Sequence, residues 1–207
     1  PHLEQLVHQY FAALPNHVCA KAPLSEPLYL AEHQALQLDI APHKFSQRLV
    51  ASFALPDIQP WYKYKLISFL AHLLGDEGPG SLLAYIKDHG WVNQLSAGGG
   101  IDGSNYKDFT LSFELTEQGV FAKEQIIEAL FGQLQLLRQS PFPEHLFLER
   151  QRLVQWSYLY QEPSTALQGA CDLSVNMQHY PVDDYVYGDY RMDVPPEQLY
   201  RELLGHF

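Results

Sequence analysis

The 207-residue sequence lacks the short motifs that identify common catalytic and nucleotide-binding sites. Neither HExxH nor HxxEH occurs, so the chain cannot by itself build a helical zinc site of that kind. The absence of GxSxG excludes a nucleophile elbow, and the absence of GxxxxGK[ST] excludes a P-loop. No predicted helix follows the glycine run at 98–100, so we do not expect it to cradle phosphate. The chain on its own is therefore predicted to be non-catalytic.

Basic residues, cysteines and long apolar runs are also scarce. Lys and Arg number 13 against 24 Asp and Glu, and the net charge of −11 would repel a phosphate backbone, so we expect no nucleic-acid partner. No run approaches the ~20 apolar residues of a membrane span, so we expect no membrane insertion. Cys19 and Cys171 are interpreted as ordinary buried or free thiols. The start shows no signal peptide and no Met, so we expect a piece of a longer chain.

Apolar spacing predicts an alternation of strands and helices. Helical periodicity is present at 3–14, 61–74, 79–89, 121–138, 143–161, 164–178 and 195–204. Two-residue alternation predicts strands at 36–40, 49–53, 91–97 and 109–115, of which the first two are expected to pair antiparallel. Glycines at 98–100 and 103 suggest a loose turn, while 15–32 and 180–193 show no clear period. The order favours an α+β fold, an antiparallel sheet with helices packed on one face.

Two histidine–carboxylate pairs could in principle place metal ligands on one helix face. His72 and Asp76 are four residues apart, as are His145 and Glu149. A pair of ligands does not complete a zinc site, and Gly75 is expected to end the helix before Asp76. We therefore interpret both pairs as solvated helix residues and predict that the chain binds no metal.

Several segments resemble one known family. The segment HLLGDEGPGSLL at 72–83 leads to KDHGWVNQLSAG at 87–98, and FAALPN at 11–16, FALPD at 53–57 and FELTEQG at 113–119 agree with it. Together they resemble the insulysin/pitrilysin (insulinase) family of zinc metallopeptidases over nearly the whole chain. In that family the zinc and its HxxEH motif lie in the first of four homologous α+β domains, and the second domain lacks the motif. The resemblance implies that this chain is the second domain of a zinc metalloendopeptidase, whose zinc it does not itself bind.

The resemblance also implies a division of the chain. Residues 1–20 would be the last helix of the preceding catalytic domain and 21–32 a linker. Residues 33–207 would be the non-catalytic domain, truncated before its final strand. Relatives occur in the periplasm or the cytoplasm, so the compartment stays open.

The resemblance places a substrate-anchoring site in this domain. It implies that the domains of the same chain close into a chamber around a peptide or small protein, whose amino-terminal segment is held at a sheet edge. The family positions of that site fall on His72, Gly75, Glu77, Leu95 and Ala97. A bare strand edge can add an extended peptide as a further strand, and Glu77 is suited to a terminal ammonium. Asp76, often His in relatives, and Ala97, often Gly, depart from the pattern.

Other interpretations remain open at this point. The glycines at 75, 78 and 80 with Pro79 would also build a tight helix–helix turn, and Leu95 would also suit a core. The chain could equally come from an inactive family member that acts as a structural or peptide-binding subunit. A third hypothesis places an activity of its own in the Tyr-rich segment 180–200.

Overall fold

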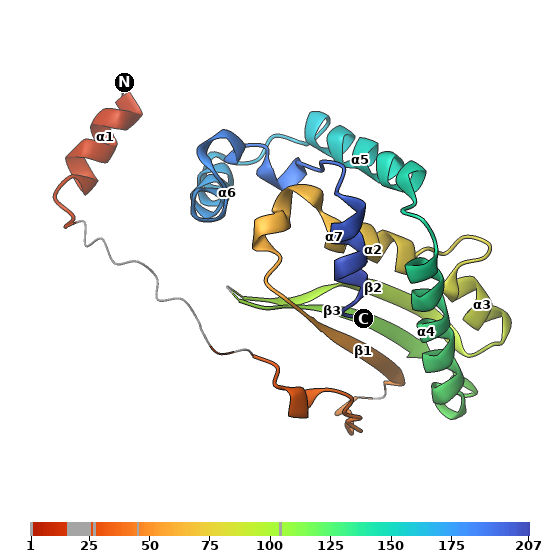
Figure 1. Ribbon diagram of the computed structural model, residues 1–207. Coiled ribbons are helices and arrows are strands. Elements are labelled where there is room, and N and C mark those ends of the chain that lie inside the picture. Colours follow the sequence, from red (N-terminus) through yellow and green to blue (C-terminus); the bar gives the residue numbers. More distant parts are fainter. Residues whose placement is uncertain (1, 16–25, 27, 45, 104) are drawn as a thin grey trace.

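A three-stranded antiparallel sheet forms the centre of the fold (Figure 1). Its strands are β1 (Arg48–Leu55), β2 (Val92–Asp102) and β3 (Lys107–Leu115), in the spatial order β1-β3-β2. β1 pairs with β3 in unbroken register, whereas the pairing of β2 with β3 is irregular near each end of β2. The computed structural model describes residues 2–15, 26, 28–44, 46–103 and 105–207.

The described residues also contain seven α-helices and five short 3-10 turns, and α1 stands apart from the sheet (Figure 1). The helices are α1 (His2–Phe11), α2 (Leu66–Leu74), α3 (Leu82–Asp88), α4 (Lys123–Gln139), α5 (Glu144–Leu159), α6 (Ala166–His179) and α7 (Glu197–Leu204). The 3-10 turns are η1 (Ala31–His33), η2 (Gln59–Tyr64), η3 (Gly119–Phe121), η4 (Val182–Asp184) and η5 (Gly188–Tyr190). The mixture confirms the predicted α+β class.

The core lies on one face of the sheet. Phe109, Leu111 and Phe113 of β3 are fully buried, while the side chains that alternate with them are less buried toward the end of the strand, where Glu114 is exposed. Apolar residues of α2, α3, α4 and α7 complete the same cluster. The period of two in β3 therefore gives the sheet one buried face, as the sequence predicted.

The predicted strand at 36–40 is wrong. These residues belong to no strand, and Leu36, Leu38 and Ile40 are 62%, 77% and 82% exposed. β1 pairs with β3 instead of with this segment. Apolar alternation indicates a strand only where a second strand supplies the hydrogen bonds, and none of the described strands lies beside 36–40.

Two local expectations are also corrected. The helix predicted over 61–74 is divided into η2 and α2 by Lys65, whose φ of 47° is left-handed. The glycines at 98–100 continue β2 rather than forming a turn, since Gly98 and Gly99 pair with β3. Cys171 is a free, exposed thiol on α6, which is one of the two interpretations given for it, and Cys19 lies outside the described residues.

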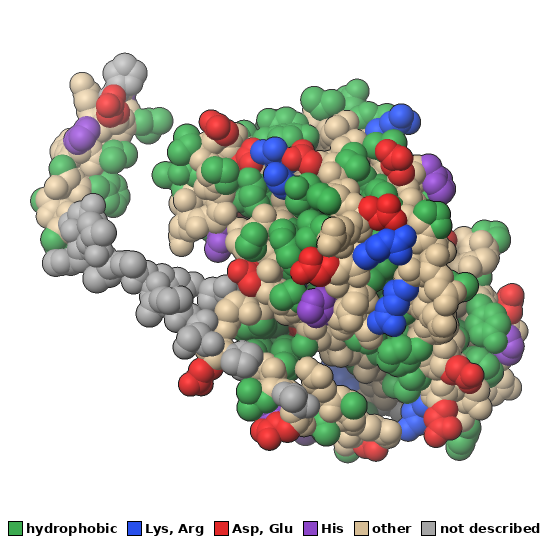
Figure 2. Space-filling model, viewed as in Figure 1, with side chains coloured by type: hydrophobic (Ala, Val, Ile, Leu, Met, Phe, Trp, Pro, Cys, Tyr) green, Lys and Arg blue, Asp and Glu red, His purple; other side chains and the backbone are tan. Residues whose placement is uncertain are grey.

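Large apolar side chains are exposed on α1, α5 and α6. No residue of α1 is buried, and Figure 2 shows hydrophobic side chains over this helix and over the α5–α6 part of the surface. The most exposed on the latter are Trp156, Leu159, Tyr160, Leu167 and Met177. Exposed apolar side chains gathered in this way are typical of interaction surfaces. None of the described helices is long and apolar enough to cross a membrane.

Candidate functional site

Two of the predicted anchoring residues, Gly75 and Ala97, lie close together where α2 ends beside β2. Gly75, directly after α2, would place a Cβ 3.5 Å from the Cβ of Ala97 in β2 and 2.8 Å from the Ala71 carbonyl oxygen. Its backbone N–H donates to that same oxygen at 2.9 Å. The distance to Ala97 is an ordinary van der Waals separation, so it is the Ala71 carbonyl, within the last turn of α2, that leaves no room for a side chain at Gly75. We refer to the meeting point of Gly75 and Ala97 as the α2–β2 corner.

The other three predicted residues differ in burial and in which of their groups a ligand could reach. His72 precedes Gly75 by three positions, so it lies on the same side of α2, and it is half-buried. Glu77 is exposed in the connection after the corner, with its carboxylate free for solvent or a ligand. The side chain of Leu95 is only 4% exposed and belongs to the core, so only its backbone can meet a peptide.

β2 forms one edge of the described sheet. It pairs with β3 on one side, and none of the described strands pairs with its other side. Strand residues on such an edge carry N–H and C=O groups that a further extended chain can satisfy. The α2–β2 corner therefore lies on an edge strand of the described sheet.

The turn between α2 and α3 has the structural role that its composition suggests. Gly80 has a φ of 84°, a conformation that favours glycine, and the Ser81 hydroxyl accepts a hydrogen bond from the Ala84 N–H at 3.1 Å to cap α3. The Ser81 backbone N–H donates to the Gly78 carbonyl at 3.1 Å. Gly80 and Ser81 therefore shape the turn that leads into α3.

Two sequence motifs far apart in the chain meet at the start of β2. The Thr116 backbone N–H donates to the Trp91 carbonyl at 3.0 Å, and its hydroxyl donates to the Gly90 carbonyl at 2.7 Å. The same hydroxyl accepts from the Gly119 N–H at 3.0 Å. The segment at 113–119 is therefore hydrogen-bonded to Gly90 and Trp91, directly before β2 begins at Val92.

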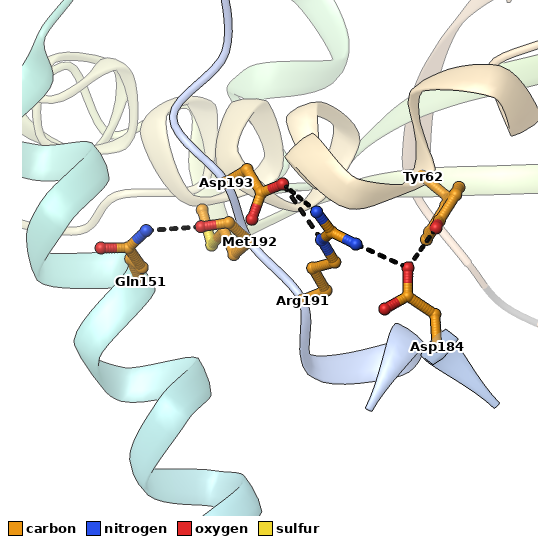
Figure 3. A network of polar contacts seen from close by, with 6 residues as sticks. All are labelled: Tyr62, Gln151, Asp184, Arg191, Met192 and Asp193. Atoms are coloured by element: carbon orange, nitrogen blue, oxygen red, sulfur yellow. Dashed lines mark hydrogen bonds and ion pairs between the residues drawn. The ribbon is translucent and has the colours of Figure 1, made fainter. Parts of the chain in front are cut away.

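A polar network joins the η2 turn to the segment after α6 (Figure 3). Tyr62 donates a short hydrogen bond to the Asp184 carboxylate, and Arg191 Nη1 donates to the same oxygen at 2.8 Å. Arg191 also donates twice to Asp193, at 3.0 and 2.9 Å, and the Asp193 N–H donates to the Lys63 carbonyl at 2.7 Å. The network holds the 184–193 segment against the turn that precedes α2.

Replacing Asp184 by Ala should lower the free energy of unfolding by about 2 kcal/mol, because Tyr62 and Arg191 lose a buried partner. The Tyr62 hydrogen bond, more than the opposing burial, lowers the pKa of Asp184 below 3.8, and Arg191 adds to it. A lowered carboxyl pKa stabilises the fold above about pH 4 and loses that effect as the pH falls through the lowered value. The deficit of the variant should therefore shrink below about pH 4.

Urea unfolding at a series of pH values measures this deficit. Asp183→Ala, which removes an exposed carboxylate one residue away, is the matched control and should change stability by less than about 0.5 kcal/mol. A deficit that stays constant from neutral to acidic pH would contradict the role assigned to the ionised Asp184.

No metal site is formed by the residues that the structure describes. No group of three His, Cys, Asp or Glu side chains there lies close enough to hold an ion. Asp76 lies beyond the end of α2, as predicted, and His145 and Glu149 are exposed on α5.

Sequence reasoning missed two features. The Asp184–Arg191 network falls in a segment whose pattern predicted no element, and only its density of Tyr and Asp pointed to polar contacts. The cavity beside Lys65 and Tyr180 was also missed, because a left-handed Lys has no local sequence signal.

Comparisons with known proteins identify the family of the chain. A family model described as the peptidase M16 inactive domain matches residues 1–154. A nardilysin-like protein of Arabidopsis thaliana is 37% identical over 160 residues, which are 75% of this chain and 16% of that protein. The insulin-degrading enzyme of Homo sapiens is 29% identical over 191 residues, 92% of this chain and 19% of that enzyme. The chain thus spans less than a fifth of the length of either relative.

A solved structure shows the same fold. The crystal structure of pitrilysin superposes with a TM-score of 0.86 over 99% of this chain and 22% of that chain, at 20% sequence identity. Together with the family match over 1–154, this agrees with the resemblance carried by the 72–83 and 87–98 segments. The chain belongs to the peptidase M16 (insulysin/pitrilysin) family of zinc metallopeptidases and corresponds to its inactive domain.

Proposed function

We propose that this chain is the substrate-anchoring domain of a larger zinc metalloendopeptidase. The observation that carries the proposal is the α2–β2 corner, where Gly75, at the end of α2, lies beside Ala97 on a strand whose outer edge has no partner among the described strands. An extended peptide would add to that edge through backbone hydrogen bonds, which need no particular sequence. Glu77 would pair with the ammonium of its first residue, and His72 would line the same site.

The zinc of the family does not fit the residues described here, since they contain no set of three suitable ligands. We place the metal, and bond cleavage with it, in another domain of the complete protein. The exposed apolar surfaces of α1, α5 and α6 support such neighbours.

The same surfaces support the proposed division of the chain. α1 exposes Leu3, Val7, Tyr10 and Phe11 and buries nothing, which suits the last helix of a preceding domain (1–20) better than a helix of this one. Residues 21–32 would be the linker, and 33–207 the anchoring domain.

Glu77→Ala should weaken peptide binding by about three- to fivefold, the size expected when an exposed ion pair is lost. The measurement is fluorescence anisotropy of a labelled neutral peptide with a free amino terminus. Acetylating that terminus should weaken binding to the unaltered chain by a similar factor and should have no effect on the Glu77→Ala variant. Glu128→Ala, which removes an exposed carboxylate from α4, is the matched control.

In the complete protein the same substitution should raise KM for short peptides and leave kcat nearly constant. A collapsed kcat with unchanged KM would show that Glu77 serves chemistry rather than anchoring. Binding that depends on Glu77 in a complete protein without peptidase activity would instead favour an inactive, peptide-binding member of the family.

A further inference from the structure

A cavity of about 430 Å³ lies between η2, the start of α2 and the far end of β2. It is lined in part by Ile67 and Ala71, which precede Gly75 by eight and four positions and so continue one side of α2. Gly99, two residues after Ala97 on the same face of β2, also lines it. The cavity therefore extends from the α2–β2 corner along the two elements that form it.

The charged side chains that line this cavity are two lysines, Lys65 and Lys107, and one carboxylate, Asp102. Lys107 Nζ lies 2.7 Å from Asp102, and its side chain packs over Gly99, where a Cβ would be 2.9 Å from Lys107 Cε. No carboxylate oxygen of the described residues lies within 4.0 Å of the Lys65 ammonium, and the remaining residues include no Asp or Glu. Lys65 thus contributes a cation without an ion pair.

The surroundings of Lys65 do not neutralise it fully. Its ammonium lies 5.8 Å from the centre of the Tyr180 ring, and burial lowers its pKa while Asp189 acts in the opposite direction. Both carboxylate oxygens of Asp189 are already engaged, one by the Tyr180 hydroxyl and one by Asn176 Nδ2, each at 2.9 Å. A half-buried cation in this position favours an anion that arrives from outside.

We propose that the cavity accepts an acidic side chain, Asp or Glu, of the anchored peptide, with Lys65 as its counter-ion. The inference rests on the proposed function, because the peptide must first lie along β2. Ile67, Ala71 and the Tyr180 ring supply an apolar wall for the methylene groups of that side chain. Lys107 remains paired with Asp102 and adds to the positive potential.

The length of β2 predicts which position of the bound peptide should prefer an acidic residue. Asp102 lies five residues beyond Ala97, a distance of about 16 Å in an extended strand. A peptide whose amino group meets Glu77 should therefore reach the cavity about four to six residues further on. Because side chains alternate between the two faces of a strand, the acidic preference should appear at one position or at every second position, not at neighbours.

The test uses the full chain and a series of labelled decapeptides with free amino termini, neutral except for one Glu, placed in turn at positions three to eight. Each is compared with its Gln counterpart by fluorescence anisotropy at about 0.15 M salt, where the repulsion from the net charge of −11 is screened. Glu at the preferred position should bind about tenfold more tightly than Gln. Lys65→Met should remove this difference, and Lys65→Arg should retain it.

Lys63→Met is the matched control, because it removes a cation two residues away that does not line the cavity. Equal binding of Glu and Gln peptides at every position, or a Glu preference that survives Lys65→Met, would overturn the inference. If the Gln peptides still bind and Glu77→Ala weakens them, the proposed function stands without it. If no peptide binds, both fail. Thermal melts of each variant establish that the fold is unchanged.

Discussion

Phe69→Ala should destabilise the fold by about 4 kcal/mol, which for a chain of this length corresponds to a melting temperature about 10 °C lower. The Phe69 side chain is 0% exposed on α2 and packs edge-on against Phe147, with ring centres 5.0 Å apart. Phe142 and Tyr200 lie within 5.7 and 6.3 Å of it. The aromatic rings come from three separate parts of the chain, so the void left by Ala cannot close by a local shift.

Thermal and urea unfolding provide the measurement, and Phe121→Ala provides the matched control. Phe121 is 89% exposed at the end of η3, and its loss should change the free energy of unfolding by less than about 0.5 kcal/mol. Equal effects of the two substitutions would show that α2 is not packed into the core as described. Since α2 carries His72 and ends at Gly75, its packing also positions the proposed anchoring site.

The sequence predicted those elements whose apolar pattern follows directly from the burial of one of their faces. β3 alternates because one face of the sheet is buried, and α4 has an apolar stripe, with Ile126, Leu130 and Leu134 buried, because one side of it packs on the sheet. The 72–83 and 87–98 segments carried the resemblance to the family, which the family model confirms, whereas the anchoring role of His72, Gly75, Glu77, Leu95 and Ala97 stays a prediction.

The remaining features depend on contacts between distant residues, which local patterns do not encode. The alternation at 36–40 has the period of a strand, but strand formation requires a partner that the described sheet does not supply. Lys65 adopts a left-handed conformation that a local pattern assigns to Gly or Asn. Asp184 finds Tyr62 across 122 residues of sequence, a pairing that is visible only in three dimensions.

Gly119→Ala should destabilise the fold by about 3 to 4 kcal/mol. A Cβ on Gly119 would lie 1.9 Å from the carbonyl oxygen of Trp91, a backbone atom that cannot rotate away. That oxygen also accepts the Thr116 N–H at 3.0 Å, so moving it breaks a hydrogen bond as well as displacing the chain. The backbone conformation of Gly119 would allow a side chain, but the Trp91 carbonyl leaves no room for a Cβ. Any other residue at this position should therefore have the same effect.

Gly132→Ala is the informative control, because a Cβ there meets nothing within 4 Å and alanine favours the α4 helix by about 0.5 to 1 kcal/mol. The two glycine substitutions should therefore shift the urea midpoint in opposite directions. A Gly119→Ala chain as stable as the unaltered one would show that Trp91 and Gly119 are not in contact. Because Trp91 immediately precedes β2, the proposed anchoring of peptides along β2 predicts that the folded fraction of this variant also binds them more weakly.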